Sequence, residues 1–160
     1  MKTTLIELTV HKKEFEEALR NFELLEEQKE FSAMPMDKIN SPKVEADAVH
    51  VVILKDEVPV GYFTLETGDK RALYTSNKQA RVLTSFSVTL PYQGKGIAKT
   101  ALQMLPMFIR STLPEVNEVV LGVNKRNVAA HGLYVACGFQ DHLEEFVGPK
   151  GPQNVLHLDV

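Results

Sequence analysis

The sequence predicts one α/β domain over residues 1–160, with a mostly antiparallel central sheet of about seven strands and about four flanking helices. Three observations predict this class. The length of 160 residues suits a single domain, and the chain shows neither an internal repeat nor a linker. Segments rich in β-branched residues alternate with segments of helical periodicity. Three extended segments with short or modest connections precede a glycine-rich turn, which favours antiparallel pairing among them.

The first part of the chain contains a strand and helical segments. Thr3–Leu8 reads TTLIEL, and its β-branched residues predict a short strand. An amphipathic helix is expected over residues 11–25, because apolar residues recur there at helical spacing. These residues are Phe15, Ala18, Leu19, Phe22 and Leu25. Residues 31–48 contain Pro35 and Pro42 and no steady period, so a loop or a broken second helix is expected.

The middle of the chain has the pattern of a hairpin followed by a long strand. Val49–Lys55 and Val58–Thr67 are extended, apolar segments that are separated by only two residues, Asp-Glu. Residues 68–79 are polar and are expected to form a loop. Ala80–Leu90 then predicts a third long strand in the core of the sheet.

After the glycines, the sequence predicts two helices and three strands. The first helix is expected to reach about Thr112, with Pro106 kinking it or leaving a backbone carbonyl free. A second, short helix is expected to begin near Asn127 and to end at Gly138 in a left-handed conformation. The three strands are expected at Asn117–Val123, Phe139–Val147 and Asn154–Val160.

Composition excludes several classes of function. The net charge of −3 argues against a broad nucleic-acid interface, which usually needs a basic excess. No apolar run approaches the ~18 residues that would cross a membrane. The N-terminus becomes charged too early for a signal peptide, so a cytoplasmic location without membrane partners is expected.

Neither cysteine nor histidine spacing points to a metal site. Cys137 is the one cysteine and lies in the apolar stretch VACGF, which predicts a small buried side chain and neither a disulfide nor a nucleophile. No two histidines have the i, i+4 spacing that places both imidazoles on one helical face, so no metal site is predicted. The five histidines are His11, His50, His131, His142 and His157.

The turn Gln93-Gly94-Lys95-Gly96 has the properties of an anion-binding site. It follows a strand and precedes a helix, and the first N–H groups of a helix have no intrahelical partner. These groups carry the positive end of the helix dipole, and glycines allow an anion to approach them. Lys95 and Lys99 add positive charge, so a phosphate is the expected ligand.

The spacing of this turn excludes two common phosphate sites. A P-loop needs GxxxxGK followed by Ser or Thr, whereas the two glycines here are only one residue apart. A dinucleotide fingerprint needs a third small residue where this chain has Lys99, and it belongs to a parallel βαβ unit. The strands before this turn are hairpin-like instead.

The motif Gln93-x-x-Gly96-x-Ala98, together with Asn127, Tyr134 and Gly138-Phe139, resembles the GNAT superfamily of acyl-CoA-dependent N-acetyltransferases. The resemblance covers essentially the whole chain and is least specific in the N-terminal third. It implies a GNAT-like fold with acetyl-CoA as the acyl donor and no metal. Ala98 is a common variant at the second small position of the motif.

The resemblance also implies a role for each matching residue. Backbone groups of the strand would pair with the pantetheine arm, the turn would surround the pyrophosphate, and Asn127 would hydrogen-bond the pantetheine. Asn127 also fits a simple helix N-cap. Tyr134 would protonate the leaving thiolate, so it is a predicted catalytic residue beside the donor. The other predicted donor contacts are Phe86, Ser87, Val88, Gln93, Gly94, Lys95, Gly96, Ile97, Ala98 and Lys99.

The general base is harder to predict. Many relatives carry Glu or Asp on the strand before the turn, but Leu83–Val88 contains hydroxyl groups and no carboxylate. Glu66, on the preceding strand, is the first candidate, because strand alternation from Gly61 would point it toward the cleft. Water relayed through Ser85 or Thr84 is the alternative. A backbone N–H near Phe86 would stabilise the oxyanion.

The acceptor is predicted only as a primary amine. The C-terminal stretch EEFVGPKGPQNVLHLDV resembles a bacterial GNAT subgroup that is often labelled polyamine or diamine acetyltransferases, which implies a polyamine acceptor. The alternative acceptors are another small molecule, such as an amino acid or an antibiotic amine, and a protein or peptide amine. Five acidic residues offer attraction for a cation, or form ordinary solvated surface. They are Glu26, Glu27, Glu30, Glu144 and Glu145. A non-catalytic acyl-CoA-binding module and a nucleotide-binding protein are the alternative functions. Homodimers are common in the family that the chain resembles, but the sequence shows no apolar surface that requires a dimer interface.

Overall fold

The computed structural model describes residues 4–160, and its strands form one seven-stranded sheet. The strands are β1 (Ile6–Val10), β2 (Val49–Lys55), β3 (Val58–Glu66), β4 (Ala80–Val88), β5 (Glu118–Asn124), β6 (Gln140–Gly148) and β7 (Gly151–Asp159). The helices are α1 (Glu16–Arg20), α2 (Glu26–Lys29), α3 (Pro35–Ile39), α4 (Gly68–Ala72), α5 (Ile97–Thr112) and α6 (Val128–Ala136), with 3-10 turns η1 (Lys13–Phe15) and η2 (Leu90–Tyr92).

The sheet has the order β1-β2-β3-β4-β5-β7-β6. Every neighbouring pair is antiparallel except β4 and β5, which are parallel because α5 carries the chain across between them. The predicted α/β class and mostly antiparallel sheet are therefore confirmed. The described residues contain six α-helices, where the sequence suggested about four, because the first helical region is divided into short pieces.

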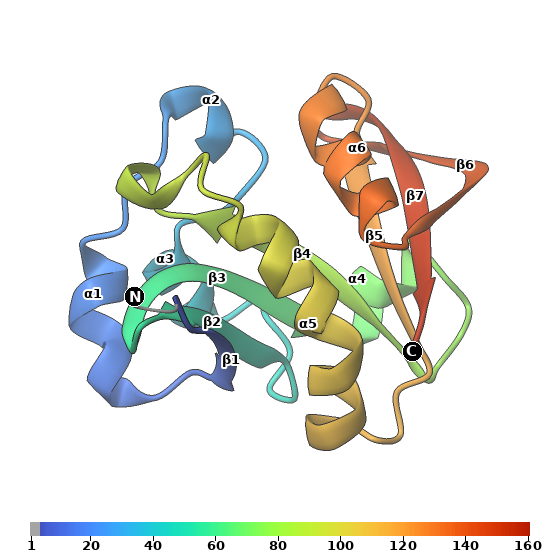
Figure 1. Ribbon diagram of the computed structural model, residues 1–160. Coiled ribbons are helices and arrows are strands. Elements are labelled where there is room, and N and C mark those ends of the chain that lie inside the picture. Colours follow the sequence, from blue (N-terminus) through green and yellow to red (C-terminus); the bar gives the residue numbers. More distant parts are fainter. Residues whose placement is uncertain (1–3) are drawn as a thin grey trace.

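The two faces of the sheet are covered by different helices (Figure 1). The long helix α5 and the shorter α6 pack on one face over the largest apolar core, which includes Ile109, Leu121 and Leu156. On the other face, α1 and α3 cover β2 through a cluster that includes Leu19 and Val52. A third, smaller cluster lies on that same face of the sheet, where Tyr74 packs against Val82 of β4, Val120 of β5 and Val155 of β7.

The N-terminal elements differ most from the prediction. The first strand is β1 at Ile6–Val10, so it ends two residues later than Leu8, and Thr3 lies outside the described residues. The expected long helix ends at Asn21, and the chain restarts as α2 at Glu26. The helix stops because the backbone of Glu23 pairs with the distant Thr89–Leu90 segment. The Glu23 N–H donates to the Thr89 hydroxyl at 2.9 Å. The Leu90 N–H donates to the Glu23 carbonyl at 2.8 Å.

The elements around the glycine turn agree closely with the prediction. The hairpin strands β2 and β3, strand β4 and helix α5 lie within two residues of their expected ends. Helix α5 continues through Pro106 to Thr112. The expected loop over residues 68–79 contains the short helix α4 at Gly68–Ala72. Within residues 4–160, no helix has the length and apolar character needed to span a membrane.

Candidate active site

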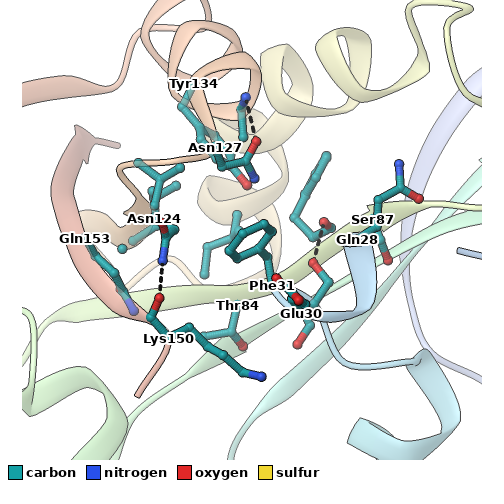
Figure 2. Close-up of a pocket in the computed structure, with 18 of the residues that line it drawn as sticks. Gln28, Glu30, Phe31, Thr84, Ser87, Asn124, Asn127, Tyr134, Lys150 and Gln153 are labelled. Atoms are coloured by element: carbon teal, nitrogen blue, oxygen red, sulfur yellow. Dashed lines mark hydrogen bonds between the residues drawn. The ribbon is translucent and has the colours of Figure 1, made fainter. Parts of the chain in front are cut away.

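A cleft opens where strands β4 and β5 separate. The two strands pair only where Ala80, Arg81 and Val82 face Glu118, Val119 and Val120. Beyond this point β4 continues to Val88 and β5 continues to Asn124 without further pairing between them. The gap contains a cavity of about 680 Å³, which is within the usual size range of small-molecule sites (Figure 2).

A β-bulge in β4 accompanies this separation. Tyr62 of β3 pairs with Ser87 and Thr64 pairs with Thr84, so Ser85 and Phe86 together stand opposite one residue of β3. Ser85 has a φ of 55°, which is rare for a residue other than glycine. Such bulges bend a strand, and they recur beside active sites.

The walls of the cavity come from several separate parts of the chain. Strands β4 and β5 form two sides, α6 and the start of α5 lie over one opening, and the α2 region lies over the other. The β6–β7 turn and α4 complete the rim. Residues of these walls include Glu27, Gln28, Glu30, Phe31, Lys38, Lys70, Tyr74, Thr84, Ser85, Phe86, Ser87, Val88, Gln93, Ala98, Gly122, Asn124, Arg126, Asn127, Tyr134, Lys150 and Gln153.

Both glycines of the turn have a left-handed backbone conformation. Gly94 and Gly96 have φ values of 73° and 79°, in the left-handed region that favours glycine. A Cβ atom at either position would meet nothing within 4 Å, so both glycines border open space. Gly96 is the N-cap of α5 and has no side chain to cap the first N–H groups, which leaves them available to an anion.

Two predicted donor contacts in this turn use their side chains for the fold. The Gln93 amide donates to the Val88 carbonyl at 2.8 Å and pairs with the Gln28 amide, which fixes the turn against α2. Ile97 is only 4% exposed and packs in the main core, so its backbone N–H is the part that faces the turn. Lys95 and Lys99 are exposed, while Ala98 lines the cavity.

Tyr134 projects from α6 into the cavity (Figure 2). Its ring packs edge-on against Phe86 and Phe139, with centroid distances of 6.3 and 5.5 Å. Within residues 4–160, its hydroxyl makes no hydrogen bond, so it is free to interact with a ligand. Burial raises the pKa of Tyr134 well above its ordinary value near 10, which keeps the hydroxyl protonated at neutral pH.

Asn127 and Ser87 also line the cavity. Asn127 is the N-cap of α6, and its side-chain oxygen accepts from the Ala130 N–H at 3.3 Å, so its capping role is confirmed. The Ser87 hydroxyl is buried and has no hydrogen-bond partner among the described residues. Buried polar groups are normally satisfied, so the Ser87 hydroxyl is an exception on β4 within the described residues.

Glu66 lies behind the cavity wall rather than on it. It is only 4% exposed, and it forms an ion pair with Lys38 at 2.9 Å. The Thr84 hydroxyl donates a hydrogen bond to the same Glu66 oxygen. Lys38 and Thr84 both line the cavity, so Glu66 is one hydrogen bond away from it.

The structure separates the five acidic residues that were grouped as cation-binding candidates. Glu27 and Glu30 line the cavity. The other three pair elsewhere: Glu26 with Lys29, Glu144 with His157 and Glu145 with Lys125. Four basic residues line the same cavity, which the sequence did not reveal. They are Lys38, Lys70, Arg126 and Lys150.

Several wall residues were missed because nothing in their local sequence marks them. The Asn124 amide donates to the Lys150 carbonyl at 2.9 Å, and its oxygen accepts from the Arg126 N–H at 2.9 Å. This side chain, 7% exposed, therefore ties the end of β5 to the β6–β7 turn. Beside Asn124, its cross-strand partner Gln153 accepts a hydrogen bond at 2.9 Å from the Tyr74 hydroxyl through its side-chain oxygen.

Cys137 does not take part in the cavity. It is half-buried against the main core, and its thiol donates weakly to the Lys99 carbonyl at 3.7 Å. Burial raises the pKa of this thiol, which disfavours the reactive thiolate. These contacts agree with the prediction of a structural cysteine.

Comparisons with known proteins agree with this geometry. The model of the Acetyltransferase (GNAT) family matches residues 13–139. A curated relative, the "Uncharacterized N-acetyltransferase YbbJ" of Bacillus subtilis (strain 168), is 37% identical over 153 residues, which cover 95% of this chain and 96% of the relative.

Solved structures with low identity share the fold. An aminoglycoside acetyltransferase, AAC(6')-Ib, in complex with coenzyme A and kanamycin superposes with a TM-score of 0.78 at 17% identity, over 97% of this chain and 95% of that one. A spermidine N-acetyltransferase from Vibrio cholerae, in complex with CoA and spermine, gives 0.71 at 13% identity, over 96% and 95%. The family match and the curated relative carry the assignment: the chain belongs to the GNAT acetyltransferase family and is an acetyl-CoA-dependent N-acetyltransferase.

Proposed function

We propose that this chain, as one acetyltransferase domain, transfers the acetyl group of acetyl-CoA directly to the primary amine of a small molecule that also carries an anionic group. The observation that carries this proposal is the cavity between β4 and β5, which has an uncapped helix N-terminus at one end and residues of both charges around the rest. A cytoplasmic location, a homodimer and the absence of nucleic-acid partners stay predictions.

The donor would lie along the open edge of β4. Its pantetheine arm would pair with the backbone of Phe86, Ser87 and Val88, because this edge has no strand partner in the cleft. Its pyrophosphate would meet the first N–H groups of α5 in the turn from Gly94 to Lys99, with Asn127 across the cleft. The thioester would then lie near Tyr134.

The reaction needs two proton transfers and one stabilised oxyanion. The neutral amine nitrogen attacks the thioester carbonyl and forms a C–N bond, while the negative charge on the carbonyl oxygen would be held by a backbone N–H near Phe86. The tetrahedral intermediate collapses when the C–S bond breaks. Tyr134 would donate its proton to the departing thiolate.

The proton lost by the amine would pass through Thr84 to Glu66. Free alkylamines have a pKa near ~10, so the bound ammonium must lose a proton before it attacks. The Thr84 hydroxyl lines the cavity and donates to Glu66, which supports a relay from the amine, directly or through water, to a buried carboxylate. This relay combines the two alternatives for the general base, which were Glu66 and a water relay through a hydroxyl group of β4.

We expect the Glu66→Gln substitution to lower kcat by about 100-fold near pH 7, because the relay then ends on an amide. The loss should shrink as the pH approaches ~10, where the amine deprotonates in solution. The pH profile of kcat is the measurement. Thr84→Val removes the hydroxyl and should give the same pH profile of kcat as Glu66→Gln. Thr84→Ser keeps the hydroxyl and should give the profile of the unaltered enzyme. An unchanged kcat together with a lowered Tm would instead make Glu66 only a structural partner of Lys38.

The charges of the cavity support an acceptor with both an amine and an anion. Glu27 and Glu30 come from the α2 side and would attract the ammonium. Lys70 and Lys150 lie on the opposite rim and would pair with a carboxylate. Lys38 is already paired with Glu66, so it contributes less.

We expect an amino acid to be acetylated with a higher kcat/KM than its amide, which lacks the carboxylate. A panel with acetyl-CoA should include both, together with spermidine, kanamycin and a short peptide, and should measure the free thiol released. Lys150→Met should raise the KM for the amino acid by about 10-fold, because a hydrogen bond between charged groups is lost. Lys29→Met, on the exposed side of α2, is the control. A preference for spermidine would support a polyamine substrate, with Glu27 and Glu30 as its contacts.

A further inference from the structure

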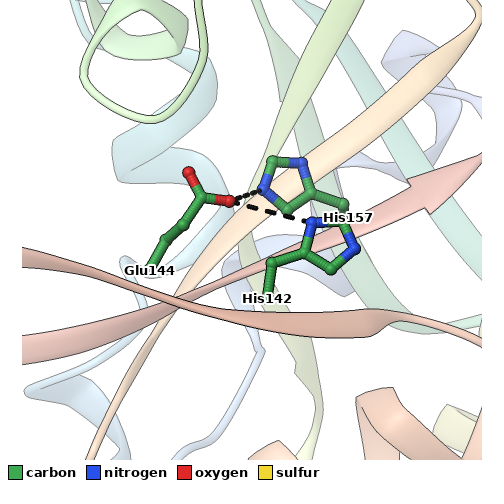
Figure 3. A group of neighbouring side chains, drawn as sticks. All are labelled: His142, Glu144 and His157. Carbon is green, nitrogen blue, oxygen red and sulfur yellow. Dashed lines mark hydrogen bonds and ion pairs between the residues drawn. The ribbon is translucent and has the colours of Figure 1, made fainter.

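Two histidines and a glutamate meet where β6 and β7 pair (Figure 3), and none of the three lines the acetyl-transfer cavity. His142 and Glu144 extend from β6, and His157 extends from the neighbouring β7. One ligand atom from each residue lies within 4.8 Å of the others. His157 follows Gln153 of the cavity wall by four residues, which is about 13 Å along a strand.

A distortion of β6 brings these side chains together. Asp141 pairs with Leu156 and Glu144 pairs with Val155, so His142 and Leu143 form an insertion between the two pairs. Leu143 has a φ of 62° and is exposed, and its backbone N–H donates to the Asp141 carboxylate at 2.9 Å, which stabilises this local conformation. The result places the two imidazole rings in a stack with centroids 4.9 Å apart.

The Glu144 carboxylate faces both rings. Its Oε1 atom is 2.7 Å from Nε2 of His157 and 3.9 Å from Nδ1 of His142. Ligand atoms of a tetrahedral zinc ion lie about 3.3 Å apart when the metal–ligand bonds are ~2.0 Å. Because the two rings are nearly parallel, the His142 ring must also turn before its Nδ1 points at the same centre as Nε2 of His157. His142 and Glu144 are both exposed, so their side chains have room to rotate.

Each imidazole is oriented by a second acceptor on its other nitrogen. Nδ1 of His157 is 3.1 Å from a Glu118 carboxylate oxygen, and Nε2 of His142 is 3.2 Å from the Gln140 side-chain oxygen. Such acceptors fix the N–H on the outer nitrogen and leave the inner nitrogen free to coordinate, as in carboxylate–histidine–zinc arrangements. The inner nitrogens are the two that face Glu144.

Both ring nitrogens of His157 face a carboxylate oxygen, Nδ1 that of Glu118 and Nε2 that of Glu144. A divalent cation between His157 and Glu144 would bind both groups and would neutralise the Glu144 carboxylate. The half-exposed position leaves room for water at the remaining coordination position.

We propose that His142 Nδ1, Glu144 Oε1 and His157 Nε2 form a binding site for one divalent transition-metal ion of the zinc class, with Glu118 and Gln140 orienting the imidazoles. Two imidazoles and a carboxylate suit Zn²⁺, Co²⁺, Ni²⁺ or Cu²⁺ and not Mg²⁺, which prefers oxygen ligands alone. The bound ion would join β6 to β7. Because the site is built across two strands, its histidines lack the helical i, i+4 spacing that marks a metal site in a sequence.

The test is a titration of the untagged, full-length, metal-free chain with ZnCl2, followed by calorimetry and by Tm. We expect one saturable site per chain, a Tm that rises with ZnCl2 concentration and no comparable effect of MgCl2. His142→Ala, Glu144→Gln and His157→Ala should each weaken binding by more than the ~10- to 100-fold that is typical of an outer partner such as Glu118. His142 and Glu144 are exposed, so their variants should fold even if His157→Ala does not.

Two matched controls define specificity. Glu145 is adjacent to Glu144 but pairs with Lys125, and His131 contacts a single carboxylate, Asp141, at 3.0 Å. Glu145→Gln and His131→Ala should bind zinc as the unaltered chain does. Absence of saturable binding, or equal binding by the ligand variants and the controls, would overturn the proposal. Acetyl transfer by the metal-free chain is measured separately, so this outcome does not depend on the proposed acceptor.

Discussion

Replacing Tyr134 with phenylalanine should lower kcat by about 100-fold or more, which is the range for loss of a positioned general acid. The KM for acetyl-CoA should change little, because the ring keeps its edge contacts with Phe86 and Phe139. The hydroxyl is the only group removed, and it has no hydrogen-bond partner within residues 4–160 to leave unsatisfied. Steady-state release of free thiol from acetyl-CoA is the measurement.

The pH profile distinguishes an acid from a structural tyrosine. Burial raises the pKa of Tyr134, so the proton stays on the oxygen throughout the range in which the amine acceptor deprotonates. The rate of the unaltered enzyme should therefore rise from pH 7 toward ~10 without a fall caused by Tyr134. The Tyr134→Phe variant should remain slow over the whole range. A higher pH deprotonates the acceptor amine, but it does not provide a proton donor for the departing thiolate.

Tyr92→Phe is the matched control for this substitution. Tyr92 is half-buried beside the turn, and its ring lies 5.4 Å from the Lys55 ammonium, outside the cavity wall. Its loss of a hydroxyl should leave kcat and the pH profile unchanged. If Tyr134→Phe and Tyr92→Phe were equally active, Tyr134 would have no role as the acid, and water would have to protonate the thiolate.

The parts of the site that local sequence encodes could be predicted. Gly94 and Gly96 take the left-handed conformation because no other residue adopts it as easily, and Asn127 caps α6 with its own side chain. These features depend on a few consecutive residues. A motif therefore locates the donor end of the site well.

The acceptor end depends on contacts between distant segments, which no local pattern records. Lys150 reaches the cavity because Asn124 holds its backbone, and Tyr74 lies there because β4, β5 and β7 cover a small core of their own. Glu144 looked like a cation-binding candidate and instead joins two histidines on another surface. Pairing across strands decides each of these positions, and one sequence does not give the pairing.

The same reasoning explains the broken N-terminal helix. Its apolar residues have helical spacing, but Leu19, Phe22 and Leu24 all enter one cluster only if the chain turns after Asn21. Hydrogen bonds between the Glu23 backbone and the Thr89–Leu90 segment stabilise that turn. Tertiary contacts override helical propensity here, and they bring the α2 region over the cleft.

Gly96→Asp should weaken acetyl-CoA binding while the fold is retained. The substitution places a carboxylate at the N-terminus of α5, where the proposed pyrophosphate would lie, and the site has room for it because a Cβ meets nothing within 4 Å. Repulsion between unit charges ~5 Å apart is about 1 kcal/mol in water and about 3 kcal/mol at an effective dielectric constant of ~20. The Kd should therefore rise by about 5- to 150-fold, and the rise should diminish in high salt.

Gly96→Asn separates this charge effect from backbone strain. Asparagine matches aspartate in size and also tolerates a left-handed φ of 79° better than most residues, so both variants share the conformational cost. Calorimetric titration of CoA should show a larger Kd for the aspartate variant, with a similar Tm for the two. Equal affinities at low salt would mean that the diphosphate does not reach the start of α5, because a negative charge placed there must repel a bound anion.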